Sequence, residues 1–266
     1  MANLLKRLLA RYAIFLMISG FILAGFEYLM CAIVSLINLP DILSNLPEQI
    51  PPVMRALIEQ QFFGGFGPTG ILAFGWNHPI ALALGTAVSI VLASRACAGE
   101  IEEGTLELIL SQPISRTTYL TAQIIFAFIS LTWLSVIGVG GMYVGQCVYA
   151  LHLLDAPTLL WLALNYLLLH AVWYSVTLLI SILGREAGQV AFIGFLITLV
   201  SYLLQVIGQL WTPAAFLLPY SANTYYSPRT LLIEHALDPK SIAILSGISV
   251  VAIAVSLWRF HRRDIP

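Results

Sequence analysis

Charge is what this sequence has least of. Charged residues make up 9% of its 266 residues, and apolar residues make up 59%. An ordinary soluble domain has roughly 25% charged residues. The mean hydropathy of +0.91 points the same way. Because so few charged side chains cannot cover a water-facing surface, the composition excludes a soluble globular protein and predicts an integral membrane protein.

Sequence motifs that carry chemistry are also lacking. No G-x-x-x-x-G-K-[ST] phosphate loop occurs, and the chain has only two lysines, Lys6 and Lys240. No H-E-x-x-H or G-x-S-x-G motif is present, and the five histidines have no ligand spacing. The three cysteines form neither a disulfide framework nor a metal-binding pattern. The sequence therefore predicts no catalytic residue, no metal and no ATP site in this chain.

Six apolar runs are long enough to cross a membrane, since about 20 helical residues span roughly 30 Å of hydrocarbon. None of them alternates in hydropathy as a barrel strand does, so each is predicted to be a helix. The sequence thus predicts an all-α integral membrane fold with one transmembrane domain over residues 1–266 and no nucleotide-binding domain. The predicted spans are residues 13–39, 70–94, 118–151, 159–183, 189–210 and 242–258.

The distribution of basic residues predicts the orientation of these spans. Nine of them fall on one side and three on the other, and short cytoplasmic loops carry the excess of Lys and Arg. Both termini are therefore predicted to be cytoplasmic. The nine are Lys6, Arg7, Arg11, Arg95, Arg116, Arg185, Arg259, Arg262 and Arg263, and the three are Arg55, Arg229 and Lys240.

Three segments outside the spans carry their own predictions. Residues 3–11 have leucines on one face and basic residues on another, which predicts an interfacial helix, or simply the basic flank of the first span. Residues 40–69 are predicted to form an outer loop, with an amphipathic helix or ordinary loop structure in its middle. Residues 211–240 contain prolines that prevent a full crossing, so a re-entrant or interfacial pair of short helices is expected there.

Residues 98–116, here called the acidic segment, are the most informative part of the chain. They lie between two apolar runs and hold four of the thirteen acidic residues, including Glu102. A helix starting near Ala98 would place Glu100, Glu103 and Glu107 on one face. Such a helix is either a docking surface for a soluble partner or a solvated amphipathic helix on the membrane. An acidic face beside anionic headgroups is unfavourable, which favours a protein partner.

The acidic segment, GEIEEGTLELILSQPISR from Gly99, closely resembles the hallmark segment of ABC type-2 exporter permeases, which also follows the second span in that family. The chain's ending, FHRRDI at residues 260–265, is similar to the basic finish of the same family. The matching positions in the acidic segment are Gly99, Glu100, Glu103, Gly104, Thr105, Leu106, Glu107, Leu110, Pro113, Ser115 and Arg116.

The resemblance implies the permease subunit of an ATP-driven exporter in the inner (plasma) membrane. The acidic segment would be the coupling helix that docks on a separate pair of ABC ATPase subunits, which would hold ATP and Mg²⁺. A second permease subunit and membrane lipids are the other expected partners, and no nucleic acid is expected. The implied ATPase-contact residues are Glu100, Glu103, Gly104, Thr105, Leu106, Glu107, Leu110, Pro113 and Arg116.

Polar residues inside the spans are candidates for a translocation path. Glu27 is costly in the first span and is therefore a functional candidate by default. Polar residues recur at helical spacing along the fourth span and form a stripe on one face of it. Two glutamines lie one turn apart in the fifth span. The alternative is that these side chains hydrogen-bond to neighbouring helices. The candidates are Glu27, Tyr166, His170, Tyr174, Thr177, Ser181, Gln205 and Gln209.

Two other functions are compatible with the same residues. One is a secondary transporter that runs on protons through Glu27, although no convincing internal repeat is present. The other is a membrane scaffold that binds a cytoplasmic ATPase and moves no substrate. The sequence does not specify a substrate, because an apolar cavity suits lipids, drugs and peptides alike.

Overall fold

The computed structural model describes residues 1–36, 51 and 68–263. The predicted outer loop at residues 40–69 therefore lies outside the described residues, except for residues 51, 68 and 69. The last residues of the basic finish, Asp264 and Ile265, lie outside them as well.

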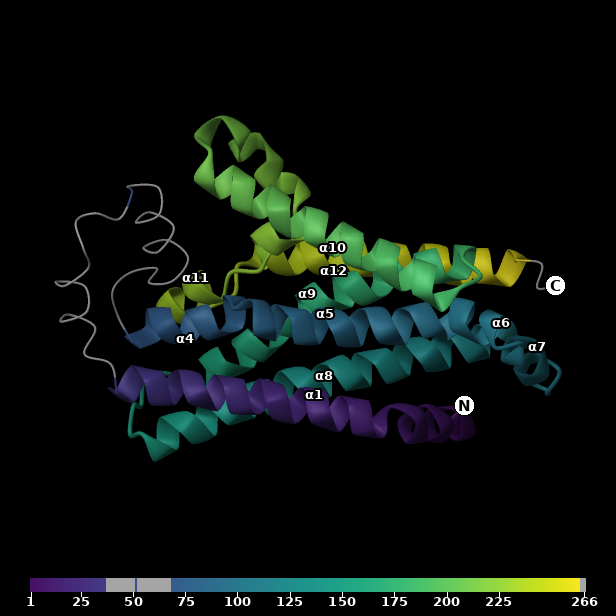
Figure 1. Cartoon of the computed structure of the whole chain (residues 1–266), viewed down its shortest axis with the longest axis horizontal. Coiled ribbons are helices and arrows are strands. Elements are labelled where there is room, and N and C mark those ends of the chain that lie inside the picture. The colour runs from purple at the N-terminus through teal and green to yellow at the C-terminus, as the bar shows by residue number, and fades with distance from the viewer. Residues whose placement is uncertain (37–50, 52–67, 264–266) are drawn as a thin grey trace.

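Six long helical stretches are apolar enough to cross a membrane, and no strand occurs among the described residues. The predicted all-α class with six spans is confirmed. The long helices run side by side, and both termini lie at one end together with the acidic segment (Figure 1). We call this the terminal end. The single-helix spans are α1 (Ala2–Leu36), α8 (Arg116–Val148), α9 (Ala156–Leu183), α10 (Ala187–Leu210) and α12 (Pro239–Arg262).

The second span is built from several helical pieces. It begins with α4 (Pro68–Asn77) and continues as α5 (Pro79–Ser94) after a break at His78. Pro79 lacks a backbone N–H and its ring clashes with the preceding turn, so it starts a new helix here. The His78 side chain accepts a hydrogen bond from the N–H of Ile80 at 3.2 Å and so caps α5.

The predicted interfacial helix at residues 3–11 is not a separate element. These residues form the first turns of α1, which continues without a break to Leu36. Neither glycine nor proline occurs between Asn3 and Ser19, so nothing in the sequence ends the helix there. At 1.5 Å per residue α1 is about 50 Å long, which exceeds the hydrocarbon thickness and lets its first turns extend beyond it.

The segment between α10 and α12 forms short helices, as the prolines predict. They are η3 (Thr212–Tyr220), η4 (Ala222–Tyr225) and α11 (Pro228–Glu234). None is long enough to cross a bilayer. The Ser221 hydroxyl donates to the carbonyl oxygen of Ser201 at 2.7 Å, which fastens the segment to α10.

Two aspartates cap the helices that begin at the end opposite the termini. The side chain of Asp155 accepts from the N–H of Thr158 in α9, and that of Asp238 accepts from the N–H groups of Lys240 and Ser241 in α12. The hydrogen bond with the Thr158 side chain lowers the pKa of Asp155, and the one from the Lys240 N–H lowers the pKa of Asp238. Their stabilising effect is therefore present at neutral pH and is lost as the pH falls through the lowered pKa values.

Helices α1 and α8 approach closely because α8 presents glycine at the contact. A Cβ atom at Gly141 would overlap the backbone carbonyl oxygen of Ala24, whereas one at Gly140 would meet nothing within 4 Å. A backbone atom cannot move aside as a flexible side chain can. The absence of a side chain at Gly141 is therefore required for this packing.

We expect Gly141→Ala to lower the free energy of unfolding by about 1–3 kcal/mol, because overpacking forces α1 away from α8. Gly140→Ala is the matched control, and it should be neutral or stabilising by up to about 1 kcal/mol, since alanine favours a helix over glycine. Thermal unfolding of both purified full-length variants in one detergent measures the difference. Equal stability of the two variants would show that the contact is not as close as described.

Candidate functional site

The acidic segment begins in a widened helical turn, η2 (Arg95–Gly99), which continues from α5. Its backbone is held from two neighbouring helices. The Tyr119 hydroxyl of α8 donates to the carbonyl oxygen of Ala96 at 2.6 Å. The Ser181 hydroxyl of α9 donates to the carbonyl oxygen of Ser94 and accepts from the N–H of Ala98, both at 3.0 Å. The two hydroxyl groups thus form hydrogen bonds with backbone groups around a turn where the regular pattern of helical hydrogen bonds is interrupted.

The acidic segment is not one helix. It consists of α6 (Glu100–Glu102) and α7 (Thr105–Leu110), which are separated at Gly104. Gly104 has a φ of 66°, a left-handed conformation that ends α6 and that glycine adopts without steric cost. The prediction that the three glutamates share one helical face is therefore wrong, because the face does not continue through Gly104.

Two of the predicted contact residues, Glu100 and Glu103, pair with arginines of this same chain. Arg11 of α1 donates to Glu100 at 2.6 Å and to Glu103 at 2.8 Å. Arg7 lies 3.5 Å from Glu100, and Arg95 lies 3.3 Å from Glu103. Glu100 is only 3% exposed, so its charge depends on these partners. The first glutamates thus join the acidic segment to the beginning of α1.

Glu102 makes a further connection inside the subunit. Its carboxylate accepts the backbone N–H of Ala187 at 2.8 Å, and Ala187 is the first residue of α10. A carboxylate at this position satisfies an unpaired N–H and lies at the positive end of the helix dipole. The acidic segment is therefore bound directly to the start of the fifth span.

Helix α7 has a buried side and an exposed side. Leu106 and Ile109 are 1% and 5% exposed and pack against the core. Glu107 is exposed, and Leu108 is 68% exposed. Glu107 has no ion pair with any residue that the structure describes. We call Glu107 and Leu108 the exposed face of α7; the helix projects from the terminal end of the bundle (Figure 1).

A shallow hollow of about 280 Å³ lies beside this face. Its walls come from α7, from the turn that follows and from the start of α8. The lining residues are Glu107, Leu110, Ser111, Ile114 and Arg116. Of the predicted contact residues, the hollow therefore gathers Glu107, Leu110 and Arg116.

The other predicted contact residues differ in how far they are exposed to solvent. Gly104 and Pro113 are exposed, and Thr105 is half-buried, with its hydroxyl donating to the Glu100 carboxylate. Glu100 and Leu106 are buried. The latter two hold the acidic segment in place, since a partner cannot reach them without rearrangement.

The residue that follows α12, Arg263, connects this helix to α9 at the terminal end. The Arg263 guanidinium donates to the carbonyl oxygen of Gly184 at 3.0 Å and to that of Ile182, both at the end of α9. Arg116 donates to the carbonyl oxygen of Arg263. Basic side chains commonly satisfy the unpaired carbonyls at a helix C-terminus. The basic finish of the chain thus has a structural role within the subunit.

The polar side chains of the α9 stripe contact the neighbouring helices. The Tyr166 hydroxyl donates to the carbonyl oxygen of Ala81 in α5 at 2.7 Å. The His170 ring occupies the space in which Gly85 of α5 has no side chain, and Thr177 packs against Gly194 of α10. Together with Tyr174, these side chains are at most 1% exposed. In this conformation they hold helices together, and their role in a translocation path stays a prediction.

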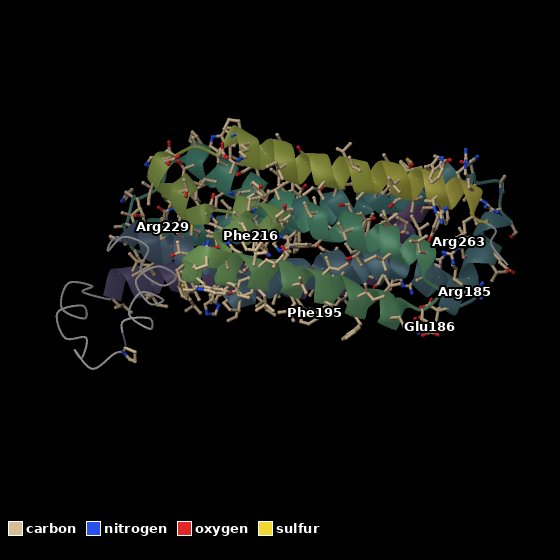
Figure 2. The ribbon with its side chains drawn as sticks, turned by 90° about the horizontal axis from the view of Figure 1, so that it is seen from above. Arg185, Glu186, Phe195, Phe216, Arg229 and Arg263 are labelled. Atoms are coloured by element: carbon tan, nitrogen blue, oxygen red, sulfur yellow. The ribbon has the colours of Figure 1, made fainter. Side chains whose placement is uncertain are left out.

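The two glutamines of α10 lie on a cavity. It has a volume of about 390 Å³ and is lined by residues of α4, the start of α5, α10, η4 and α11. Its walls combine amides with aromatic rings, including Gln205, Gln209, Asn223 and Tyr202. Arg229 lies on this cavity, at the end of the molecule opposite Arg185, Glu186 and Arg263 (Figure 2). Of the candidate path residues, Gln205 and Gln209 line this cavity, and the Glu27 carboxyl is fully buried.

Sequence reasoning missed several residues of the terminal end. It did not assign Arg7 and Arg11 as partners of the acidic segment, and it did not identify Ser181 as an anchor for η2. Basic residues near the N-terminus and glutamates on the same predicted side were the available signal for the ion pairs. Their specific pairing requires the positions of α1 and α6 in space, which charge patterning alone does not supply.

Six helices that are long and apolar enough to cross a membrane define the class as a multi-pass α-helical membrane protein. Among the described residues, no cluster of His, Cys, Asp and Glu is able to hold a metal ion. The family model described as ABC-2 family transporter protein matches residues 5–265. The chain therefore belongs to the ABC-2 transporter family and is a membrane component of transport. No curated protein matches it.

The ion pairs at Arg11 provide a test of the terminal end. We expect Glu100→Gln and Arg11→Gln each to lower the free energy of unfolding by about 1–3 kcal/mol, because each leaves a charged partner poorly paired. The double variant should lose less than the sum of the two, since the residues act on one another. Thermal unfolding of the full chain in one detergent measures all three changes.

Glu107→Gln is the matched control for this cycle, because Glu107 lies on the same segment and is exposed. It should unfold as the original protein does. If the effects of Glu100→Gln and Arg11→Gln are simply additive, the ion pair does not form in solution.

Proposed function

We propose that the protein is the permease subunit of an ATP-driven ABC-2 exporter. It lies in the inner (plasma) membrane with both termini in the cytoplasm. Its acidic segment is the coupling element that docks on a pair of separate ABC ATPase subunits, and these subunits bind and hydrolyse ATP with Mg²⁺. Membership of the ABC-2 family and the absence of a phosphate loop support the assignment of transport to this chain and of ATP hydrolysis to separate subunits.

The exposed face of α7 is the observation that carries the proposal. The other strongly exposed leucines among the described residues lie on the long apolar helices, but Leu108 lies on a short helix beyond the spans and next to a carboxylate. An apolar side chain beside an unpaired charge at a protruding tip is typical of a protein contact with a hydrophobic centre and a polar rim. The adjacent hollow adds a concave surface that a side chain of the ATPase is able to enter.

The connections of the acidic segment support its role in coupling. Arg11 links it to α1, Glu102 links it to α10, and η2 continues it into α5. Ser181 adds a link to α9. A displacement of α7 by the ATPase would therefore act on four spans together, because these links are short hydrogen bonds and ion pairs and not a flexible loop.

The cavity at the opposite end is the part of the structure best suited to a substrate. It places Gln205 and Gln209 of α10 on its wall, where amides are able to bind polar groups and the aromatic rings are able to bind apolar ones. Helix α10 is also the least buried span, with 17% of its most apolar stretch buried inside the subunit. This exposed surface is available to a second permease subunit or to lipid. Lipids, drugs and peptides remain the candidate substrates.

We expect Glu107→Lys to reduce the amount of ATPase that co-purifies with the tagged full-length protein by at least about tenfold, which corresponds to about 1.4 kcal/mol. A lysine reverses the charge at the centre of the exposed face without removing an internal ion pair. The measurement is purification from native membranes in mild detergent, followed by mass spectrometry to identify and quantify a subunit with a phosphate loop.

Glu234→Lys is the matched control, because it makes the same charge change on an exposed residue of α11, at the other end of the molecule. This variant should retain the ATPase. Undiminished recovery of the ATPase with both Glu107→Lys and Leu108→Ser would rule out docking through α7. Retention of the ATPase without any transport in reconstituted vesicles would instead favour the scaffold function.

A further inference from the structure

The side chain of Glu27 is enclosed within the outer half of α1. It is 0% exposed, and it lies about 22 Å along the helix axis from Tyr12, at 1.5 Å per residue. It points toward α4 at Gly75, where a Cβ atom would lie only 2.9 Å from Glu27 Oε2. The close contact between α1 and α4 therefore leaves no space for solvent on this side of the carboxyl group.

Among the residues that the structure describes, the Glu27 carboxyl group has no partner to stabilise a negative charge. Neither oxygen has a hydrogen-bond partner, and no ion pair joins Glu27 to any residue that the structure describes. Glu100 provides the contrast within the same chain, since it is also buried but is paired with Arg7 and Arg11. The two glutamates thus occupy opposite electrostatic environments.

Within the described part of the chain, the titratable groups that face Glu27 do not supply a positive charge. They are Cys31 on α1 itself, Tyr166 on α9 and Tyr226 after η4. Helix α4 contains no titratable side chain, and Tyr143 and Cys147 of α8 are exposed. A thiol and two phenols are neutral at physiological pH, so they do not compensate a buried carboxylate.

These surroundings determine which form of the carboxyl group is stable. An exposed glutamate has an ordinary pKa of about 4.3 and is therefore ionised in a roughly 500-fold excess at pH 7. An unpaired carboxylate in an apolar interior is destabilised by far more than this preference, and such groups bind a proton instead. We propose that Glu27 is a proton-binding site and that it is a neutral carboxylic acid at physiological pH.

The site lies close to the cavity at the opposite end. Gly75 and Trp76 are adjacent on α4, and the Tyr226 hydroxyl donates to the carbonyl oxygen of Trp76 at 3.0 Å. Tyr226 also lines the cavity. One helix and one tyrosine thus separate the Glu27 carboxyl from the cavity. Water that reached the carboxyl group through these contacts would stabilise its charged form.

Infrared spectroscopy of the full-length protein at neutral pH tests the proposal, in a detergent without ester groups so that no ester carbonyl band overlaps the signal. A neutral carboxylic acid has a carbonyl band that is separate from the bands of carboxylates. We expect this band in the original protein, and we expect Glu27→Gln to remove it. Glutamine has the size of glutamic acid and is also neutral, so the variant should fold. Glu107→Gln is the matched control and should leave the band in place.

A carboxylic acid band that is absent, or that Glu27→Gln leaves unchanged, would overturn the proposal. If the variant does not fold, the original protein labelled with carbon-13 in its glutamate carboxyl groups decides the question. A carboxylic acid band that shifts with the label supports a protonated glutamate, and the lack of a shifted band overturns it. Neither measurement depends on the ATPase, so this result is independent of the proposed function.

Discussion

The hydrocarbon interior of a membrane contains no water to hydrogen-bond with the backbone, and the architecture of this protein follows from that constraint. Every backbone N–H and C=O in a span must find a partner within the chain, which leaves helices as the available structure for these apolar runs. Where the helical ladder is interrupted, a side chain supplies the missing partner. His78 does so at the start of α5, and Ser181 does so at η2.

The same constraint explains why polar side chains in the core are informative. Tyr166 is fully buried, yet its hydroxyl finds a carbonyl oxygen on a neighbouring helix, so its burial stabilises the contact. Glu27 is buried to the same degree and has no partner among the described residues. Such a residue is costly to keep in a membrane span. Glu27 thus differs from a satisfied packing residue such as Tyr166 in that its unpartnered group is a carboxyl, which an apolar interior keeps in its neutral form.

Charged side chains are concentrated at the terminal end, where some pair within the subunit and others stay exposed. Glu100, Glu102 and Glu103 are used within the subunit, since they bind arginines of α1 and η2 and the start of α10. Glu107 remains available on the outside. Because Gly104 breaks the segment between these groups, the internal glutamates fix its position while the exposed face of α7, the proposed docking surface, stays free. This arrangement fits the coupling role proposed for the segment.

Composition and hydropathy alone determined that the chain is a six-span helical membrane protein, because the length needed to cross a bilayer and the cost of buried charge leave little alternative. Local residues also predicted the short helices after α10, where Pro213 and Pro219 prevent a crossing. Only the tertiary structure decided which glutamates pair within the subunit and which stays exposed, since the pairing of Glu100 with Arg11 joins residues 89 positions apart. It also decided that the α9 stripe packs against other helices and that Gln205 and Gln209 line a cavity, because helical periodicity defines a face but not its neighbour.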